Sequence, residues 1–75
     1  MTLTEVELSK EYIISDIATG DSELESFLFS LGCFSGEGIT VVSRRKKTLV
    51  VAIKDARYCI DHALGECIFV EGERV

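Results

Sequence analysis

The chain has 75 residues, of which 47% are hydrophobic, and this suits one small domain with a compact core. Its formal net charge of −5 disfavours nucleic acid or an anionic lipid surface as the main partner, because both need a basic footprint. No apolar run approaches the roughly 18 residues of a membrane span, and the first residues lack a signal-peptide pattern. We therefore expect one cytoplasmic domain over residues 1–75, without membrane insertion, with its core in 3–70 and a frayed tail at 71–75.

The first predicted elements are a strand and a helix. Residues 12–17 have the β-branched and aromatic content of a strand. After a Gly-Asp-Ser turn the hydrophobic period becomes helical, which predicts a helix over about residues 22–31. Ser22 with Glu25 has the pattern of a capping box, and Gly32 stands where a left-handed residue commonly ends a helix. The apolar stripe expected to face the core comprises Leu24, Phe27, Leu28 and Leu31.

Short strands and one further helical turn are predicted after this helix. Arg44-Arg45-Lys46-Lys47 is typical of a solvated hairpin tip, and the alternative is a contact with phosphate or an acidic partner. Residues 61–66 are expected to form the helical turn. The predicted strands span 39–43, 48–54, 58–60 and 67–70, and the stripe is expected to pack against Val41, Val51, Ile53 and Ile68.

A small sheet with a single helix to cover it can bury its inner face by curling. We therefore predict a mainly β fold, in which about five strands form a small, partly open SH3-like barrel. The one α-helix, at about residues 22–31, follows the first strand.

Several short motifs occur in a familiar order over residues 3–71. They are Leu8 at the opening of the first strand, Phe27-Leu28-Phe29-Ser30-Leu31-Gly32-Cys33 followed by Gly36, the strand containing Val41, and Tyr58-Cys59-Ile60 leading to Ile68-Phe69-Val70. This order resembles the ferrous iron transport A (FeoA) family, which typically reads L-x-x-G, R-L-x-x-L-G-L, x-x-G-x-x-V and A-L-x-x-x-x-A-x-x-I-x-V. No single motif is specific, and the resemblance rests on the full order and spacing.

The chain departs from the family pattern at three places. Ser9-Lys10-Glu11 replaces the early glycine, and Ser26 or Phe27 stands where the family has a helix arginine. The small residue near the end falls on Gly65. These changes are compatible with the fold, but they put in doubt any partner contact made through that arginine.

The resemblance implies a cytoplasmic SH3-like barrel that supports a membrane ferrous iron transporter with a GTPase domain, by protein–protein contact. Similar domains also end some metal-dependent transcription repressors, so a metal-responsive regulatory domain is the alternative. Fold alone does not decide between these roles.

Enzymatic activity is not expected from the motifs present. The chain has no GxxxxGK[ST], GxGxxG or HExxH sequence, and His62 is its only histidine. We therefore predict a non-enzymatic protein.

Metal binding is a weaker hypothesis with a defined ligand set. Cys59, His62 and Cys67 form a C-x2-H-x4-C pattern whose soft ligands could hold Fe(II) or Zn(II). Against this, Cys59 lies in a predicted strand where a small buried hydrophobe fits, and Cys33 takes the place of a family leucine in the core. The odd number of cysteines indicates reduced thiols. We therefore assign no cofactor and no firm metal site, and direct metal carriage stays the third alternative.

Two aromatic residues are candidates for a partner interface. Phe34 and Phe69 each adjoin a position that the pattern directs inward, so each is expected to be partly exposed. Exposed aromatic side chains often mark protein interfaces.

Overall fold

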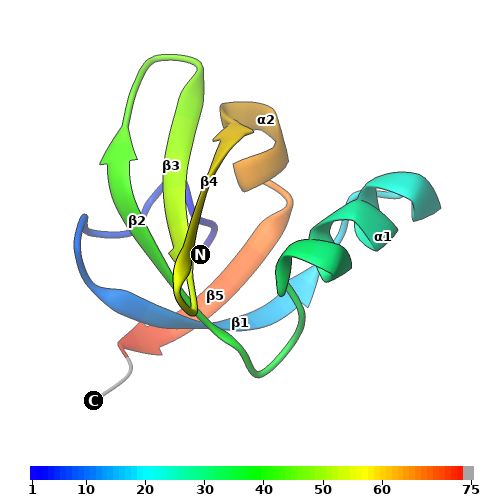
Figure 1. Ribbon diagram of the computed structural model, residues 1–75, viewed down its shortest axis with the longest axis horizontal. Coiled ribbons are helices and arrows are strands. Elements are labelled where there is room, and N and C mark those ends of the chain that lie inside the picture. Colours follow the sequence, from blue (N-terminus) through cyan, green and yellow to red (C-terminus); the bar gives the residue numbers. More distant parts are fainter. Residues whose placement is uncertain (74–75) are drawn as a thin grey trace.

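The computed structural model describes residues 1–73, which form a curled sheet with two helices (Figure 1). The elements are β1 (Glu11–Ile17), α1 (Ser22–Leu31), β2 (Gly38–Arg44), β3 (Thr48–Ile53), β4 (Ala56–Asp61), α2 (His62–Gly65) and β5 (Ile68–Glu73). Neighbouring strands are antiparallel in the order β4-β3-β2-β1-β5. β4 and β5 are therefore the two edges of an open sheet, and α2 connects them. The predicted five strands and the helix at residues 22–31 are confirmed.

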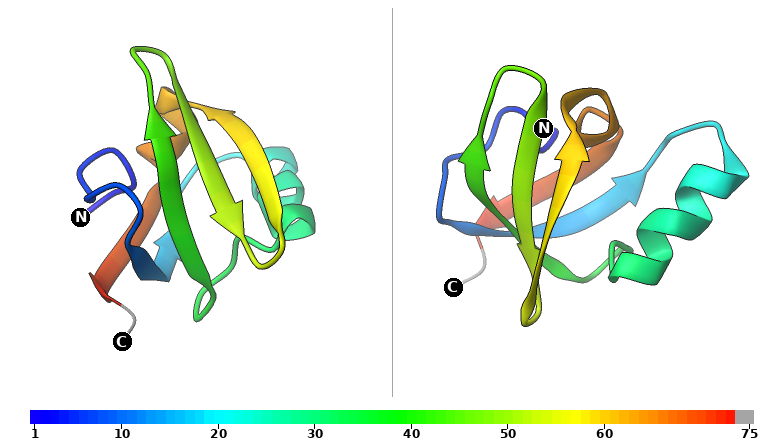
Figure 2. Two further views of the ribbon diagram at one scale, coloured as in Figure 1. Left: turned by 60° about the vertical axis from the view of Figure 1, so that its left-hand side comes forward. Right: turned by 45° about the horizontal axis from the view of Figure 1, so that its top comes forward.

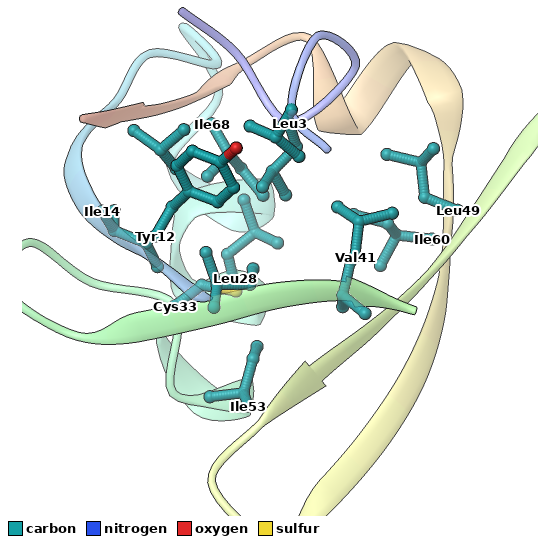
Figure 3. Close-up of a cluster of buried hydrophobic side chains, with 14 residues drawn as sticks. Leu3, Tyr12, Ile14, Leu28, Cys33, Val41, Leu49, Ile53, Ile60 and Ile68 are labelled. Atoms are coloured by element: carbon teal, nitrogen blue, oxygen red, sulfur yellow. The ribbon is translucent and has the colours of Figure 1, made fainter. Parts of the chain in front are cut away.

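The inner face of the sheet carries the core (Figure 3). β3 alternates as predicted, with Leu49, Val51 and Ile53 buried. Tyr12 is also buried, and its hydroxyl oxygen accepts a hydrogen bond from the Glu7 N–H at 3.2 Å, which satisfies the one polar atom of that side chain. The buried apolar residues among those described are Leu3, Val6, Tyr12, Ile14, Leu28, Cys33, Ile39, Val41, Leu49, Val51, Ile53, Ile60, Ile68 and Val70.

The last strand is longer than predicted. Glu71 pairs with Ile13 and Glu73 with Tyr12, so the expectation of a frayed tail is wrong for residues 71–73. Pairing with β1 gives this segment backbone hydrogen bonds that its polar sequence does not reveal. Residues 74–75 of the expected tail lie outside the described residues.

Residues 1–9 precede the first strand, yet two of them belong to the core. Leu3 and Val6 are buried, and the Leu3 N–H donates to the Ile68 carbonyl at 3.1 Å. The expectation that Leu8 opens the first strand is wrong, because Leu8 lies in a turn before β1 and is 46% exposed. The first nine residues thus add two apolar side chains to the core.

Arg44 fastens this N-terminal segment to the barrel. Its guanidinium donates hydrogen bonds to the carbonyl oxygens of Thr4, at 3.2 Å, and Val6. The prediction that residues 44–47 form a solvated tip with no structural role is therefore wrong for Arg44. The side chains of residues 45–47 are exposed as predicted, although the Lys47 carbonyl accepts a hydrogen bond from the His62 N–H at 2.8 Å. The contacts of Arg44 join residues about 40 apart in the chain, which a local charge pattern cannot show.

The ends of α1 have defined caps. Asp21 is the N-cap, and its carboxylate accepts hydrogen bonds from the N–H groups of Glu23, at 2.9 Å, and Leu24, at 3.3 Å. The predicted capping box beginning at Ser22 is wrong by one residue, because the preceding aspartate supplies the acceptor. At the other end Gly32 has a φ of 98°, as predicted for a left-handed cap.

The packing of α1 differs from the predicted stripe. Leu28 is fully buried and Leu31 partly buried, whereas Leu24 and Phe27 are exposed. Figure 2 shows the reason: α1 approaches the barrel with its C-terminal end and projects away from it at its N-terminal end. A small barrel therefore buries only the last turns of the helix.

α2 connects the edge strands β4 and β5 and lies very close to β3. A Cβ atom on Gly65 would lie 2.5 Å from Cδ1 of Leu49, which is closer than side chains can pack. The absence of a side chain at Gly65 therefore lets the short helix approach β3, and the small residue anticipated there has a packing reason.

Candidate functional site

α1 presents large apolar side chains to solvent. Leu24, Phe27 and Phe29 are 41%, 50% and 64% exposed, and we call these three residues the α1 surface. Single exposed apolar residues are ordinary, but three on one ten-residue helix are a concentration of apolar surface, with Leu24 and Phe27 on one side of the helix and Phe29 on the other. The sequence feature that indicates this surface is the number of large apolar residues in the helix, which exceeds the number that one helix stripe can bury.

The charges around the α1 surface are acidic. Asp21 caps the helix, Glu23 and Glu25 lie in its first turn, and residues 22–31 contain no lysine or arginine. Acidic groups at a helix N-terminus interact favourably with the helix dipole, so they stabilise α1 while leaving its surface negative. A partner for this surface would need apolar side chains and positive charge.

A first hollow of about 220 Å³ lies between α1 and the end of β1. Phe29 and Phe34 form part of its wall, with ring centroids 5.0 Å apart. The ammonium of Lys54 lies 5.8 Å from the centroid of the Phe34 ring. The residues that line this first hollow are Asp16, Ile17, Glu25, Phe29, Cys33, Phe34 and Ser35.

A second hollow of about 250 Å³ lies between α1 and the α2 region. Leu24 comes from α1 and Asp61 from the end of β4, so this hollow joins a helix and an edge strand that are distant in sequence. Its lining residues are Thr19, Leu24, Asp61, Ala63, Leu64 and Cys67.

The two predicted interface aromatics lie in different surroundings. Phe34 is half-buried and lines the first hollow, beside the α1 surface. Phe69 is 38% exposed on β5, where it pairs with Asp16 and Thr2, and it lines neither hollow. The structure therefore does not bring Phe34 and Phe69 together on one surface.

The candidate metal ligands are also spread apart. Cys59 is exposed on β4, so the expectation that it is a buried core residue is wrong. The side chain of His62 approaches Glu66, with 3.8 Å between Nδ1 and Oε1, and Cys67 Sγ donates to the Ala63 carbonyl at 3.6 Å. Within residues 1–73, no three His, Cys, Asp or Glu side chains are grouped so that they could hold a metal ion.

The third thiol belongs to the core, as predicted. Cys33 is 2% exposed, and burial raises the pKa of its thiol to about 11. Desolvation disfavours the thiolate, which is both the nucleophile and the metal-binding form. Cys33 is therefore a packing residue that is inert near neutral pH.

None of the helices in the described part of the chain is both long and apolar enough to cross a membrane.

Solved structures with the same architecture define the class of this protein. The chain matches a crystal structure of the iron uptake regulatory protein FeoA with a TM-score of 0.83 and 21% identity, covering 93% of both chains. It matches the zinc complex of FeoA from Stenotrophomonas maltophilia, described as a prokaryotic SH3 domain protein, with a TM-score of 0.82 and 20% identity, over 95% of this chain and 89% of that one. The fold is therefore an SH3-like barrel.

A longer protein contains the same fold. A manganese-dependent transcriptional repressor matches with a TM-score of 0.84 and 19% identity, over 93% of this chain but only 40% of the repressor. No curated protein sequence matches significantly. The FeoA domain family model, however, matches residues 1–72. The chain therefore belongs to the FeoA domain family.

Proposed function

We propose that this chain is a non-enzymatic accessory module of ferrous iron transport, which acts in the cytoplasm by contact with a membrane iron transporter carrying a GTPase domain. Membership of the FeoA family supports the link to ferrous iron, and the S. maltophilia relative has been put forward as a ferrous iron transport activating factor. The observation that carries the mode of action is the exposed α1 surface.

The chemistry of the described residues supports contact rather than catalysis or metal carriage. The two hollows beside α1 are lined largely by apolar side chains, as expected of a surface that receives a partner's side chains. Under this proposal iron passes through the transporter and not through this chain, and no three His, Cys, Asp or Glu side chains of residues 1–73 are grouped as a metal site. Phe34 extends the α1 surface, whereas Phe69 is a separate candidate contact on β5.

A direct binding experiment tests this proposal. The full chain is titrated, by calorimetry, into the detergent-solubilised transporter encoded by the same organism. We expect saturable binding that weakens by about tenfold or more when Phe27 and Phe29 are both replaced by Ser, because exposed aromatics commonly carry interface energy. Lys46→Ser on the exposed hairpin tip is the matched control and should bind like the wild type. Absence of saturable binding by the folded wild-type chain would contradict the proposal.

A second candidate function is a metal-responsive regulatory domain. The observation that favours it is the fold match to 40% of a manganese-dependent repressor. Such a domain would respond to metal, so Mn(II), Fe(II) or Zn(II) at micromolar concentration should raise its melting temperature. A melting temperature that does not change with any of these ions argues for the accessory module.

A further inference from the structure

The two edges of the sheet differ in what covers them. On β5, the Ile68 carbonyl accepts from the Leu3 N–H at 3.1 Å, and the Val70 N–H donates to the Met1 carbonyl at 2.8 Å. Thr2 also forms a bridge with Phe69, so the N-terminal segment occupies this edge.

The outer edge of β4 has no such cover. β4 pairs with β3 along residues 56–61, and within residues 1–73 no other segment forms a backbone hydrogen bond with residues 56–60. An uncovered edge presents a row of N–H and C=O groups that fits another extended chain. β4 is therefore the edge at which a further strand can pair with the sheet.

The uncovered edge lies on the same side of the barrel as α1. In Figures 1 and 2, α1 lies beyond β4 on the side opposite β3. The second hollow connects Leu24 of α1 with Asp61 at the end of β4. Phe27 follows Leu24 by one helical turn and shares its side of α1, whereas Phe29 lies on the other side and lines the first hollow.

We infer that an extended segment of a protein partner adds to the outer edge of β4 as a further antiparallel or parallel strand, and that its side chains rest against Leu24 and Phe27. The inference rests on the proposed function and specifies how the partner is held. Strand addition obtains affinity from main-chain hydrogen bonds and specificity from alternate side chains. The helix beside the edge supplies the apolar surface for those side chains.

Charged residues lie along the groove between the outer edge of β4 and α1, and they specify the partner segment further. Asp61 lines the second hollow, whose lining contains no lysine or arginine, and Glu23 lies one turn before Phe27 on α1, so the α1 side of this edge is acidic. The basic hairpin tip adjoins the same end of β4 on the β3 side, where the Lys47 carbonyl accepts from the His62 N–H at 2.8 Å. Arg57, exposed near the start of β4, gives the opposite end of the strand a positive charge. The segment recognised is therefore extended, alternates apolar with polar residues, and carries a basic side chain where it passes Asp61.

Nuclear magnetic resonance of the ¹⁵N-labelled full chain tests the inference with defined probes. The probes are N-acetylated hexapeptides in which Val alternates with Lys, Thr or Glu. We expect the Lys peptide to shift the amide signals of residues 57–61 and to bind about tenfold more tightly than the Glu peptide, by electrostatic complementarity. Methylation of alternate peptide nitrogens should abolish the shifts, because it removes the ladder donors.

Two matched variants locate the side-chain contacts. Phe27→Ala should weaken binding of the Lys peptide by about fivefold or more. Leu8→Ala, a truncation of an exposed apolar residue in the turn before β1, should leave it unchanged. Because Phe27 and Leu8 are 50% and 46% exposed, both variants should stay folded, which a thermal melt checks.

The results that would contradict strand addition can be told apart from those that would contradict the proposed function. Shifts that spare residues 57–61, or no shifts with any of the three peptides, would overturn strand addition. So would a dimer in sedimentation together with β4 amide signals that move as the concentration of the chain alone is raised. Transporter binding that leaves the β4 signals unchanged would reject this inference while preserving the proposed function. Shifts at β4 without transporter binding would reject the proposed partner while preserving strand addition.

Discussion

Replacing Arg44 with Met removes the guanidinium that holds the N-terminal segment but keeps an apolar stem. The variant loses the hydrogen bonds to the carbonyls of Thr4 and Val6. Hydrogen bonds to a charged group contribute about 1.5–3 kcal/mol, so we expect Arg44→Met to lower the free energy of unfolding by about that amount. This is a large share of the stability of a small domain.

Urea unfolding of the purified chain measures this loss, and hydrogen exchange localises it. The amides of Leu3 and Val70 bond across the N-terminal segment and β5, so both should exchange faster in Arg44→Met. Lys46→Met in the same hairpin is the control, because its exposed charge should contribute less than about 0.5 kcal/mol. Equal stability of the two variants, with unchanged exchange, would refute the assigned role of Arg44.

Three further predictions address the core. Leu28→Ala should cost about 2–5 kcal/mol in a urea melt, and Phe27→Ala less than about 1 kcal/mol, since only Leu28 is buried; equal costs would contradict the packing of α1. Gly65→Ala should lower the melting temperature, because its Cβ would collide with Leu49; an unchanged melt would show that α2 can shift freely. Burial raises the pKa of Cys33 to about 11, so the contribution of this thiol to stability should be constant below about pH 9 and fall by about 3 kcal/mol as the pH rises to about 11, because the unfolded thiol ionises first. Cys33→Ala should lack this fall, and identical pH profiles of the two proteins would refute burial of the thiol.

The sequence predicted the parts of the fold that depend on local periodicity. Leu49, Val51 and Ile53 alternate along β3, and their burial follows from a period of two. Gly32 likewise ends α1 in the left-handed conformation that few other residues adopt readily. These features are encoded by neighbours in the chain, so one sequence suffices to predict them.

Features that depend on distant contacts were predicted less well. The helix period correctly grouped Leu24, Phe27 and Leu28 but could not show that the barrel is too small to cover all of them. Arg44 looked like part of a solvated tip because its acceptors lie far away in sequence. Cys59 was expected inside because strand content alone does not specify which face of an edge strand is covered.

The candidate site was only partly predictable. Phe34 was correctly expected to be partly exposed, and it lies beside the α1 surface. The main members of that surface were overlooked, because Leu24 and Phe27 were assigned to the core and Phe29 to neither face. The useful signal was an excess of large apolar residues over what one stripe can bury.

Ferrous iron uptake by cells of the source organism that lack this chain tests the central claim most directly. The cells are resupplied with the wild type or with the triple variant Cys59→Ser, His62→Ala, Cys67→Ser, which removes the candidate metal ligands. Because the account assigns the chain's role to protein contact, it predicts that both proteins restore radioactive iron uptake equally. Restoration by the wild type but not by the triple variant, with both proteins folded and present at equal levels, would contradict it.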